Sequence, residues 1–479
     1  MITSDSPDRP YSTRLRTALV LTGTGTAGAY HAGVLRALHE AGVRIDLVAG
    51  RGVGAVGAMF AAVDGGQRLW EPAGLWKQPA IAQAYRWRAP LRIAGWGLGT
   101  AAALLAVPLA LTAVGVVAAL VAVLLSLLTL SDASTAVSSA YSRSVDALFA
   151  PSALPTIIPG LIVFCLLVAI GALAVGFALD AWRAPARRRV RHGEIWRLIG
   201  APLTSAVVLN RSIAELWNLI RGAAAIAPPP RQDLGRRYVE LLAENLGQPG
   251  FRELLLVAHD MDARRDVLFA LLRDEYRTRF FAHRADPARG TGGGRAAEAF
   301  DLAGVGREHV IDALAASLCV PMATDPHLLR FPTEGPWRGE THRVCDRPGT
   351  LDRILEEVQI AGAEQVIVLS AAPLPGRPHE LSAGRADLRG RAAEQLFSFE
   401  AADLRDSLER AAGRFAGLFV IRPAHNPLGP LDFSGVYDER SDRAYPLGEL
   451  VDRGYEDAYH QFIEPVVAAS GERIETVQS

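Results

Sequence analysis

The first 63 residues carry a pattern of hydrophobic, glycine-rich and amphipathic segments that predicts two consecutive strand–turn–helix units. Each unit begins with a short uninterrupted hydrophobic run, which is typical of a buried strand, and continues through a turn rich in glycine. The first helix that follows is amphipathic, whereas the second consists almost entirely of small and apolar residues. The predicted strands, turns and helices are, in chain order, residues 16–21, 23–28, 29–42, 45–50, 50–54 and 55–63.

Two much longer hydrophobic runs follow, and neither Ile93–Leu130 nor Ile157–Leu179 contains a charged residue. The second run matches the roughly 20 residues that one membrane-spanning helix needs. The first run is nearly twice as long, so we expect it to tilt, to extend past the bilayer, or to bend near Pro108 and Gly115. The pair predicts a transmembrane helical hairpin inserted over residues 91–182.

The topology of this hairpin follows from parity and from the distribution of arginine. Segments before residue 60 and after residue 250 are expected to share one sheet, so the insertion crosses the bilayer an even number of times. Two crossings, with Ser131–Thr156 as the far-side loop, are the simplest solution; alternatively, both runs re-enter without crossing. The far loop has Arg143 as its single basic residue, whereas many arginines flank the domain side. Because cationic side chains favour the cytoplasmic face, we expect a cytoplasmic main domain. The flanking arginines are Arg86, Arg88, Arg92, Arg183, Arg187, Arg188, Arg189 and Arg191.

Composition narrows the possible partners. The formal net charge of −1 over 479 residues gives no reason to expect nucleic acid. Lys77 is the one lysine among fifty basic residues, which indicates a GC-rich, bacterial genome and hence a bacterial inner membrane. Three cysteines are too few for a disulfide framework. Residues 1–15 are polar, so no signal peptide is expected there. No cofactor is expected, and no metal either, because His259, Asp260 and Asp262 are better explained as turn and capping residues.

The two glycine turns resemble those of the patatin-like phospholipases, in which the first forms an oxyanion hole and the second is a G-x-S-x-G elbow. Such an elbow exposes a nucleophile above the sheet, next to backbone amides that stabilise the oxyanion. Here Gly52 occupies the serine position, so the resemblance implies a lipase-like site without its nucleophile. The elbow residues are Gly50, Arg51 and Gly54; the implied oxyanion or ligand-binding residues are Gly23, Gly25, Thr26, Gly28 and Val53.

The family pairs its serine with an aspartate in a D-G-G or D-G-A turn, and the best match here is Asp346 in Val344–Gly349. Arginine replaces the glycine that should follow this aspartate. Asp346 is therefore a degenerate dyad partner with no serine to act on. We expect it to pair with either Arg347 or Arg51, which would fill the vacant pocket with an ion pair.

Downstream segments resemble the same family in the same order. Phe251–Leu272 is similar to its central strand and return, Val310–Leu329 to its helix with a proline turn, and Gly362–Pro375 to the strand after the aspartate. The resemblance implies a three-layer α/β/α domain with a largely parallel sheet, interrupted by the transmembrane hairpin. The expected segments are a first part of the domain, the hairpin, a basic amphipathic helical segment, and a second part with a C-terminal extension: residues 14–90, 91–182, 183–250 and 251–479.

Three functions are compatible with the sequence. The favoured one is a membrane-anchored protein that binds membrane phospholipid or acyl lipid without hydrolysing it, and so acts in binding, sensing or scaffolding. The second is an active lipid acyl hydrolase that uses another nucleophile. The third is an NADP-binding oxidoreductase, because Gly23-x-Gly25-x-x-Gly28 also fits the dinucleotide fingerprint and Arg51 stands near the position of a 2′-phosphate ligand. The oligomeric state and the lipid are left open by the sequence.

Overall fold

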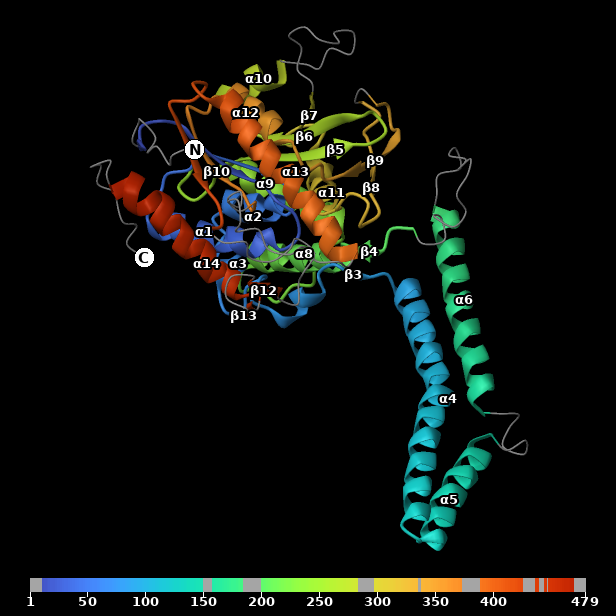
Figure 1. The fold of residues 1–479 in the computed structure, drawn as a ribbon. Helices are drawn as coiled ribbons and strands as arrows, with labels where there is room; N and C mark the ends of the chain where they lie inside the picture. Colours follow the sequence, from blue (N-terminus) through green and yellow to red (C-terminus); the bar gives the residue numbers. More distant parts are fainter. Residues whose placement is uncertain are drawn as a thin grey trace. The chain divides into compact units, whose positions relative to one another are not determined.

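The computed structural model describes residues 11–149, 157–183, 200–282, 297–334, 337–372, 388–424, 436–438, 443–445 and 447–468. Contacts divide the chain into two compact units, which are shown in Figure 1. The main domain comprises Met1–Arg86 and Leu203–Ser479, and the inserted helical unit comprises Trp87–Pro202.

The main domain is built on a sheet that has nine strands among the described residues, with the central order β11-β10-β1-β2-β5-β6-β7. Neighbours from β11 to β5 are parallel, as are β6 and β7, whereas β5–β6, β5–β9 and β8–β9 are antiparallel. The strands are β1 (Thr17–Leu21), β2 (Leu47–Arg51), β5 (Glu253–Asp260), β6 (Arg265–Leu271), β7 (Ala297–Asp301), β8 (His327–Arg330), β9 (Thr341–Cys345), β10 (Gln365–Leu369) and β11 (Gly417–Ile421).

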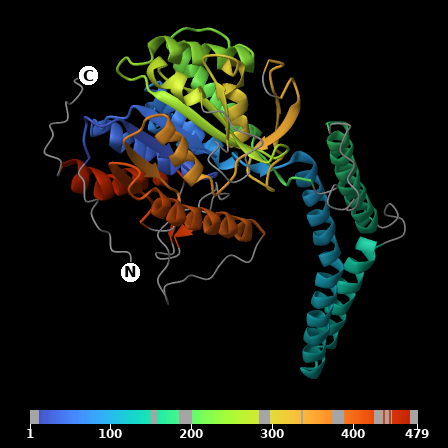
Figure 2. The ribbon, with the colours of Figure 1, turned by 90° about the horizontal axis from the view of Figure 1, so that it is seen from above.

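Alternating side chains of the central strands pack against helices on both faces of the sheet. Leu19 and Leu21 of β1 join one hydrophobic cluster, which includes α1, α2, α11 and α14. Ala18 and Val20 join the other, which includes α12 and part of α13. A strand buried on both faces has to be hydrophobic throughout, which is why β1 reads as an uninterrupted apolar run. The predicted three-layer α/β/α fold with a largely parallel sheet is confirmed, and its layers can be followed in Figures 1 and 2.

The helices of the main domain are α1 (Ala27–Glu40), α2 (Gly54–Ala62), α3 (Gln67–Trp70), α8 (Ala206–Arg221), α9 (Arg231–Asn245), α10 (Asp274–Ala282), α11 (Val310–Ser317), α12 (Leu351–Ile360), α13 (Leu388–Ala411) and α14 (Glu449–Ala458). Short helical segments are η1 (Pro79–Gln83), η2 (Arg307–His309) and the π-helical η3 (Tyr459–Val467). Short strands are β3 (Arg86–Trp87), β4 (Leu203–Thr204), β12 (Val436–Asp438) and β13 (Arg443–Tyr445). Val208, Leu209, Leu216 and Trp217 of α8 belong to the hydrophobic core of the main domain, so this helix packs into it.

Within its described residues, the inserted unit consists of three helices, α4 (Ala89–Leu127), α5 (Ser131–Phe149) and α6 (Ile157–Arg183). Helix α4 remains continuous through Pro108 and, at about 1.5 Å per residue, is nearly twice as long as a bilayer core is thick. The connection between α4 and α6 contains helix α5, which packs back on α4. Tyr141 Oη of α5 donates a hydrogen bond to Leu111 O of α4 at 2.8 Å.

Small residues hold α4 and α6 together. A Cβ on Gly97 would lie only 2.8 Å from Cys165 O and 3.3 Å from Ala169 Cβ, so glycine permits the close approach. Both helices are long and apolar enough to cross a membrane, with mean hydropathies of 2.6 and 2.8, and only 6% of each apolar window is buried. Apolar surface exposed on this scale is unusual for a soluble protein and suggests, by length and composition, a membrane association. Arg187, Arg188, Arg189 and Arg191 lie outside the described residues.

Candidate functional site

The two glycine turns leave neighbouring parallel strands, β1 and β2, at the same edge of the sheet. This carboxyl edge is where open α/β sheets place their ligands. After β2 the chain reverses through Gly52, which has φ +55°, and enters α2 two residues later. A Cβ on Gly50 would lie 2.6 Å from Gly54 O, so the tight strand-to-helix reversal requires a glycine there. The segment therefore has the local geometry of a nucleophile elbow, including the left-handed backbone at its centre.

The space that a nucleophile would occupy is filled by the first glycine turn. The carbonyl oxygen of Gly23 accepts a hydrogen bond from the Val53 amide at 3.0 Å. In an elbow, the amide after the nucleophile is the one expected to hold the oxyanion. A Cβ on Gly52 would overlap this same carbonyl and would lie 2.9 Å from Asp346 Oδ2. Both the oxyanion donor and the volume of a serine side chain are thus taken by protein atoms.

The other residues implied by the resemblance lie in the same region. Gly23 and Gly25 have φ of +124° and +63°, which only glycine adopts readily. Thr26 immediately precedes α1. Gly28 lies inside α1, where any Cβ would overlap the indole of Trp76, so its role there is close packing.

An ion cluster occupies the position of the missing dyad. Arg51 pairs with Asp346 at 3.1 Å and with Glu400 at 3.0 Å, and all three side chains are at most 5% exposed. The Thr24 hydroxyl lies 3.1 Å from Glu400 Oε1 and 3.4 Å from Asp346 Oδ2. Of the two pairings expected for Asp346, the one with Arg51 is present; Arg347 instead pairs with Asp266 at 2.7 Å.

The cluster holds one cation and two carboxylates away from water. Burial raises the pKa of Asp346 to about 6, with Arg51 opposing this rise and Glu400 adding to it. Burial by itself lowers the pKa of Arg51, but the two carboxylates outweigh it and the pKa is raised. Arg51 therefore remains charged at neutral pH and acts as the counter-ion of the pair.

Glu400 is not predicted by the sequence patterns, since it comes from α13, more than 300 residues after the elbow. The same helix contributes Asp403, whose Oδ2 accepts the Leu351 amide at the start of α12 at 2.9 Å. Helix α13 is thus fastened next to the turn that carries Asp346.

Alternative nucleophiles near the elbow are poorly activated. Burial raises the pKa of Cys319 to about 11 and that of Cys345 to about 12, whereas a reactive thiol has a lowered pKa. His31 is completely buried, and burial lowers its pKa to about 3, so it is a weak base. Its ring nitrogens have no hydrogen-bond partner among the described residues, and the nearby Thr22 backbone opposes the lowering of its pKa.

The cavity that the described residues form beside the elbow is small. A cavity lined by Thr24, Thr26, Ala27 and Tyr30, among others, measures only about 10 Å³. Drug-sized ligand pockets are typically 300–1,000 Å³. Farther along the sheet, Asp260 Oδ1 accepts the amides of Asp262 and Ala263 at 2.8 and 3.0 Å, so the predicted turn-capping role of this acidic residue is confirmed. Among the described residues, no cluster of histidine, cysteine or acid is suited to a metal ion.

Comparison with known proteins agrees with this geometry. The family model described as "Patatin-like phospholipase" matches residues 19–337, about two thirds of the chain. Patatin-like phospholipase domain-containing protein 6 of mouse and of human are each 47% identical over 60 residues, which cover 12% of this chain. The matched stretch spans only 4% of the length of these relatives.

A solved structure, VipD from Legionella pneumophila, aligns over 95% of this chain and 68% of the VipD chain, at 14% identity and a TM-score of 0.30. The family match includes both glycine turns and most of the sheet. This chain belongs to the patatin-like phospholipase family.

Proposed function

We propose that this protein is a membrane-anchored, non-hydrolytic member of the family, which binds or organises membrane lipid without cleaving it. The observation that carries the proposal is the replacement of the serine by Gly52 together with the Arg51–Asp346 pair beside it. An ester hydrolase of this type needs a hydroxyl nucleophile, a base and an open oxyanion hole. At this elbow no side chain carries a nucleophile, and Asp346 is paired with the Arg51 guanidinium. The Val53 amide already donates its hydrogen bond to Gly23 O.

The lipid partner is proposed from the family and from the inserted helices. Helices α4 and α6 would span the bilayer as an antiparallel pair, and α5 would lie on the far side. The arginines at the domain side, including Arg86, Arg88 and Arg92, favour a cytoplasmic main domain and attract anionic headgroups by about 1 kcal/mol each. The protein would then present its main domain at the inner face of a bacterial membrane.

The two competing functions have less support. A hydrolase with a different nucleophile would have to activate Thr24, whose carboxylate partners Asp346 and Glu400 are both paired with Arg51, or a cysteine whose pKa is raised. An NADP-binding oxidoreductase would need Arg51 for a 2′-phosphate. Arg51 is 2% exposed and already holds Asp346 and Glu400, so it has neither the access nor the free charge.

The full-length protein in detergent should neither react with a fluorophosphonate probe nor hydrolyse a short-chain nitrophenyl ester or phosphatidylglycerol. Without its serine, such a site retains only the weak catalysis that comes from substrate and oxyanion binding. Here the Val53 amide, the expected oxyanion donor, is already bonded to Gly23 O. We expect turnover at least thousands-fold below that of a working lipase. Asp346→Asn serves as the control: in the absence of a functional dyad it should leave this background unchanged. Probe labelling, or turnover lost in Asp346→Asn, would contradict the proposal.

The membrane topology can be tested with two single-cysteine additions, Ser138→Cys in α5 and Glu409→Cys in α13, both at exposed positions. The native Cys319 and Cys345 are buried and should react slowly. In spheroplasts, a membrane-impermeant maleimide should label Ser138→Cys at once and Glu409→Cys only after the membrane is opened. The reverse pattern would invert the topology, and protection of both sites would show that the hairpin does not cross.

A further inference from the structure

A second site lies at the opposite, amino-terminal edge of the sheet. There an open cavity of about 340 Å³ is lined by the turn before β2, the turn before β5, and Arg273 after β6. Its lining is mainly polar, and its charged residues are Arg44, Asp46, Arg252, Glu253 and Arg273. This cavity is about thirty times the volume of the one beside the elbow. It lies within the range of small-molecule pockets.

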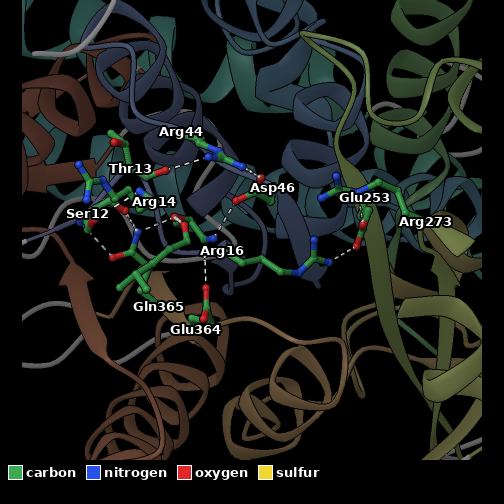
Figure 3. A network of polar contacts seen from close by, with 12 residues as sticks. Ser12, Thr13, Arg14, Arg16, Arg44, Asp46, Glu253, Arg273, Glu364 and Gln365 are labelled. Carbon is green, nitrogen blue, oxygen red and sulfur yellow. Dashed lines mark hydrogen bonds and ion pairs between the residues drawn. The ribbon is translucent and has the colours of Figure 1, made fainter. Parts of the chain in front are cut away.

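Two arginines share one carboxylate at the wall of this cavity. Glu253 is 1% exposed, and it pairs with the buried Arg16 through Oε2 and with Arg273 through Oε1 at 2.8 Å. Figure 3 shows the two guanidinium groups approaching Glu253 from different sides. Both also lie over the ring of Tyr276, with Arg16 Cζ 3.6 Å from its centroid. One carboxylate balances one guanidinium, so this group carries an excess positive charge in a partly desolvated place.

Donor atoms remain available around that charge. Arg273 bonds through Nε alone within the described chain, which leaves both terminal nitrogens for a ligand. Arg16 is not among the residues that line the cavity, and its guanidinium lies against the Tyr276 ring, so its charge acts on the site from behind Glu253. A guanidinium with free terminal nitrogens at the wall of a cavity is a suitable partner for an oxyanion.

The remaining charges do not cancel this excess. The Arg44 guanidinium pairs with Asp46 Oδ1 at 3.1 Å, while the Thr17 amide occupies Oδ2. Arg252 pairs weakly with Asp64 at 3.4 Å. Each of these pairs is neutral, and the carboxylate oxygens facing the cavity are already bonded. The guanidinium of Arg273, which Glu253 holds in place, is therefore the group in this cavity that should attract an anion most strongly.

We infer that this cavity is a binding site for a phosphate-bearing solute or headgroup, with Arg273 as the principal contact. A guanidinium with two free terminal nitrogens matches two oxygens of a phosphate, and its preset orientation limits the entropy lost on binding. The apolar walls formed by Val43, Ile45 and Phe251 would receive the organic part of a phosphate ester. The site is separate from the elbow, so the inference does not depend on whether the elbow hydrolyses esters.

The test is titration calorimetry of the full-length protein in detergent with glycerol 3-phosphate and inorganic phosphate. Arg273→Gln is expected to weaken binding by about 10- to 100-fold, which is the usual effect of losing a charged hydrogen-bond donor. Arg277→Gln provides the matched control. Its side chain is equally exposed, at 35%, and pairs with Asp301 away from the cavity. This control should bind like the unmodified protein.

A second arm distinguishes the two sources of phosphate. If soluble esters do not bind, titration of the detergent-solubilised protein with short-chain phosphatidic acid in mixed micelles should show binding that Arg273→Gln weakens and Arg277→Gln does not, which would assign the site to a headgroup. Binding of soluble esters would assign it to a free solute. Absence of any Arg273-dependent binding in both arms, with all variants folded by circular dichroism, would overturn the inference.

Discussion

Replacing Arg51 with leucine is expected to lower the free energy of unfolding by about 3–5 kcal/mol at pH 7. The substitution leaves Asp346 and Glu400 buried side by side without their cation, and Thr24 offers only one hydroxyl hydrogen to the two carboxylates. Like charges in a site of low polarity repel strongly, and neither can recover its hydration. The measurement is urea unfolding of the detergent-solubilised protein, followed by tryptophan fluorescence.

The destabilisation by Arg51→Leu should depend on pH in a definite direction. The pKa of Asp346 is already raised by burial, to about 6, and loss of Arg51 should raise it further. A carboxyl whose folded-state pKa exceeds its unfolded-state value, about 4, binds more protons in the folded state between those values. Stability therefore falls as pH rises through this interval, so the penalty of Arg51→Leu should be largest above pH 6 and should shrink toward pH 4.5.

Two controls separate the cluster from general effects of losing arginine. Arg347→Leu removes a guanidinium that is 42% exposed and pairs with Asp266, and should cost at most about 1 kcal/mol. Combining Arg51→Leu with Asp346→Asn and Glu400→Gln removes the buried charge altogether and should restore much of the lost stability. If Arg51→Leu unfolded at the same urea concentration as the unmodified protein, the cluster would not be the structural replacement of the dyad that we describe.

The elements around the elbow can be predicted from the sequence because they depend on local patterns. The strand and helix boundaries of the first 63 residues differ from the structure by only a few residues. The pairing of Asp346 with Arg51 is one of two options that the sequence allows, since the aspartate turn and the elbow meet in any fold of this family. The structure decides between them because Arg347 lies within reach of Asp266 instead.

Three features of the same chain have no local signal. Glu400 reaches Arg51 from α13, and sequence distance gives no measure of that contact. The hydrogen bond from the Val53 amide to Gly23 O depends on the orientation of one peptide group, which glycine leaves free. Helix α5, in the segment between the two long apolar runs, is not predicted because its serine-rich sequence is weakly apolar, and its packing on α4 is a tertiary contact. The Arg16–Glu253–Arg273 group is not predicted either, because Arg16 lies far from the other two residues in the sequence.

Restoring the serine is expected to fail as a route to activity. Gly52→Ser should lower the free energy of unfolding by about 3 kcal/mol or more, because two costs add. A residue with a Cβ at φ +55° costs on the order of 1 kcal/mol or more by itself. The new Cβ would also overlap Gly23 O and approach Asp346 Oδ2 to 2.9 Å, so the first glycine turn would have to move.

Gly413→Ser separates these two costs, because Gly413 also has a positive φ, +81°, and no described atom lies within 4 Å of the position that its Cβ would take. It should show the backbone cost alone, about 1 kcal/mol. Gly52→Ser should hydrolyse a short-chain nitrophenyl ester no faster than the unmodified protein, since Arg51 neutralises the acid and the Val53 amide is occupied. Substantial esterase activity in Gly52→Ser would mean that the turn opens readily, and that the ion cluster leaves the dyad geometry usable.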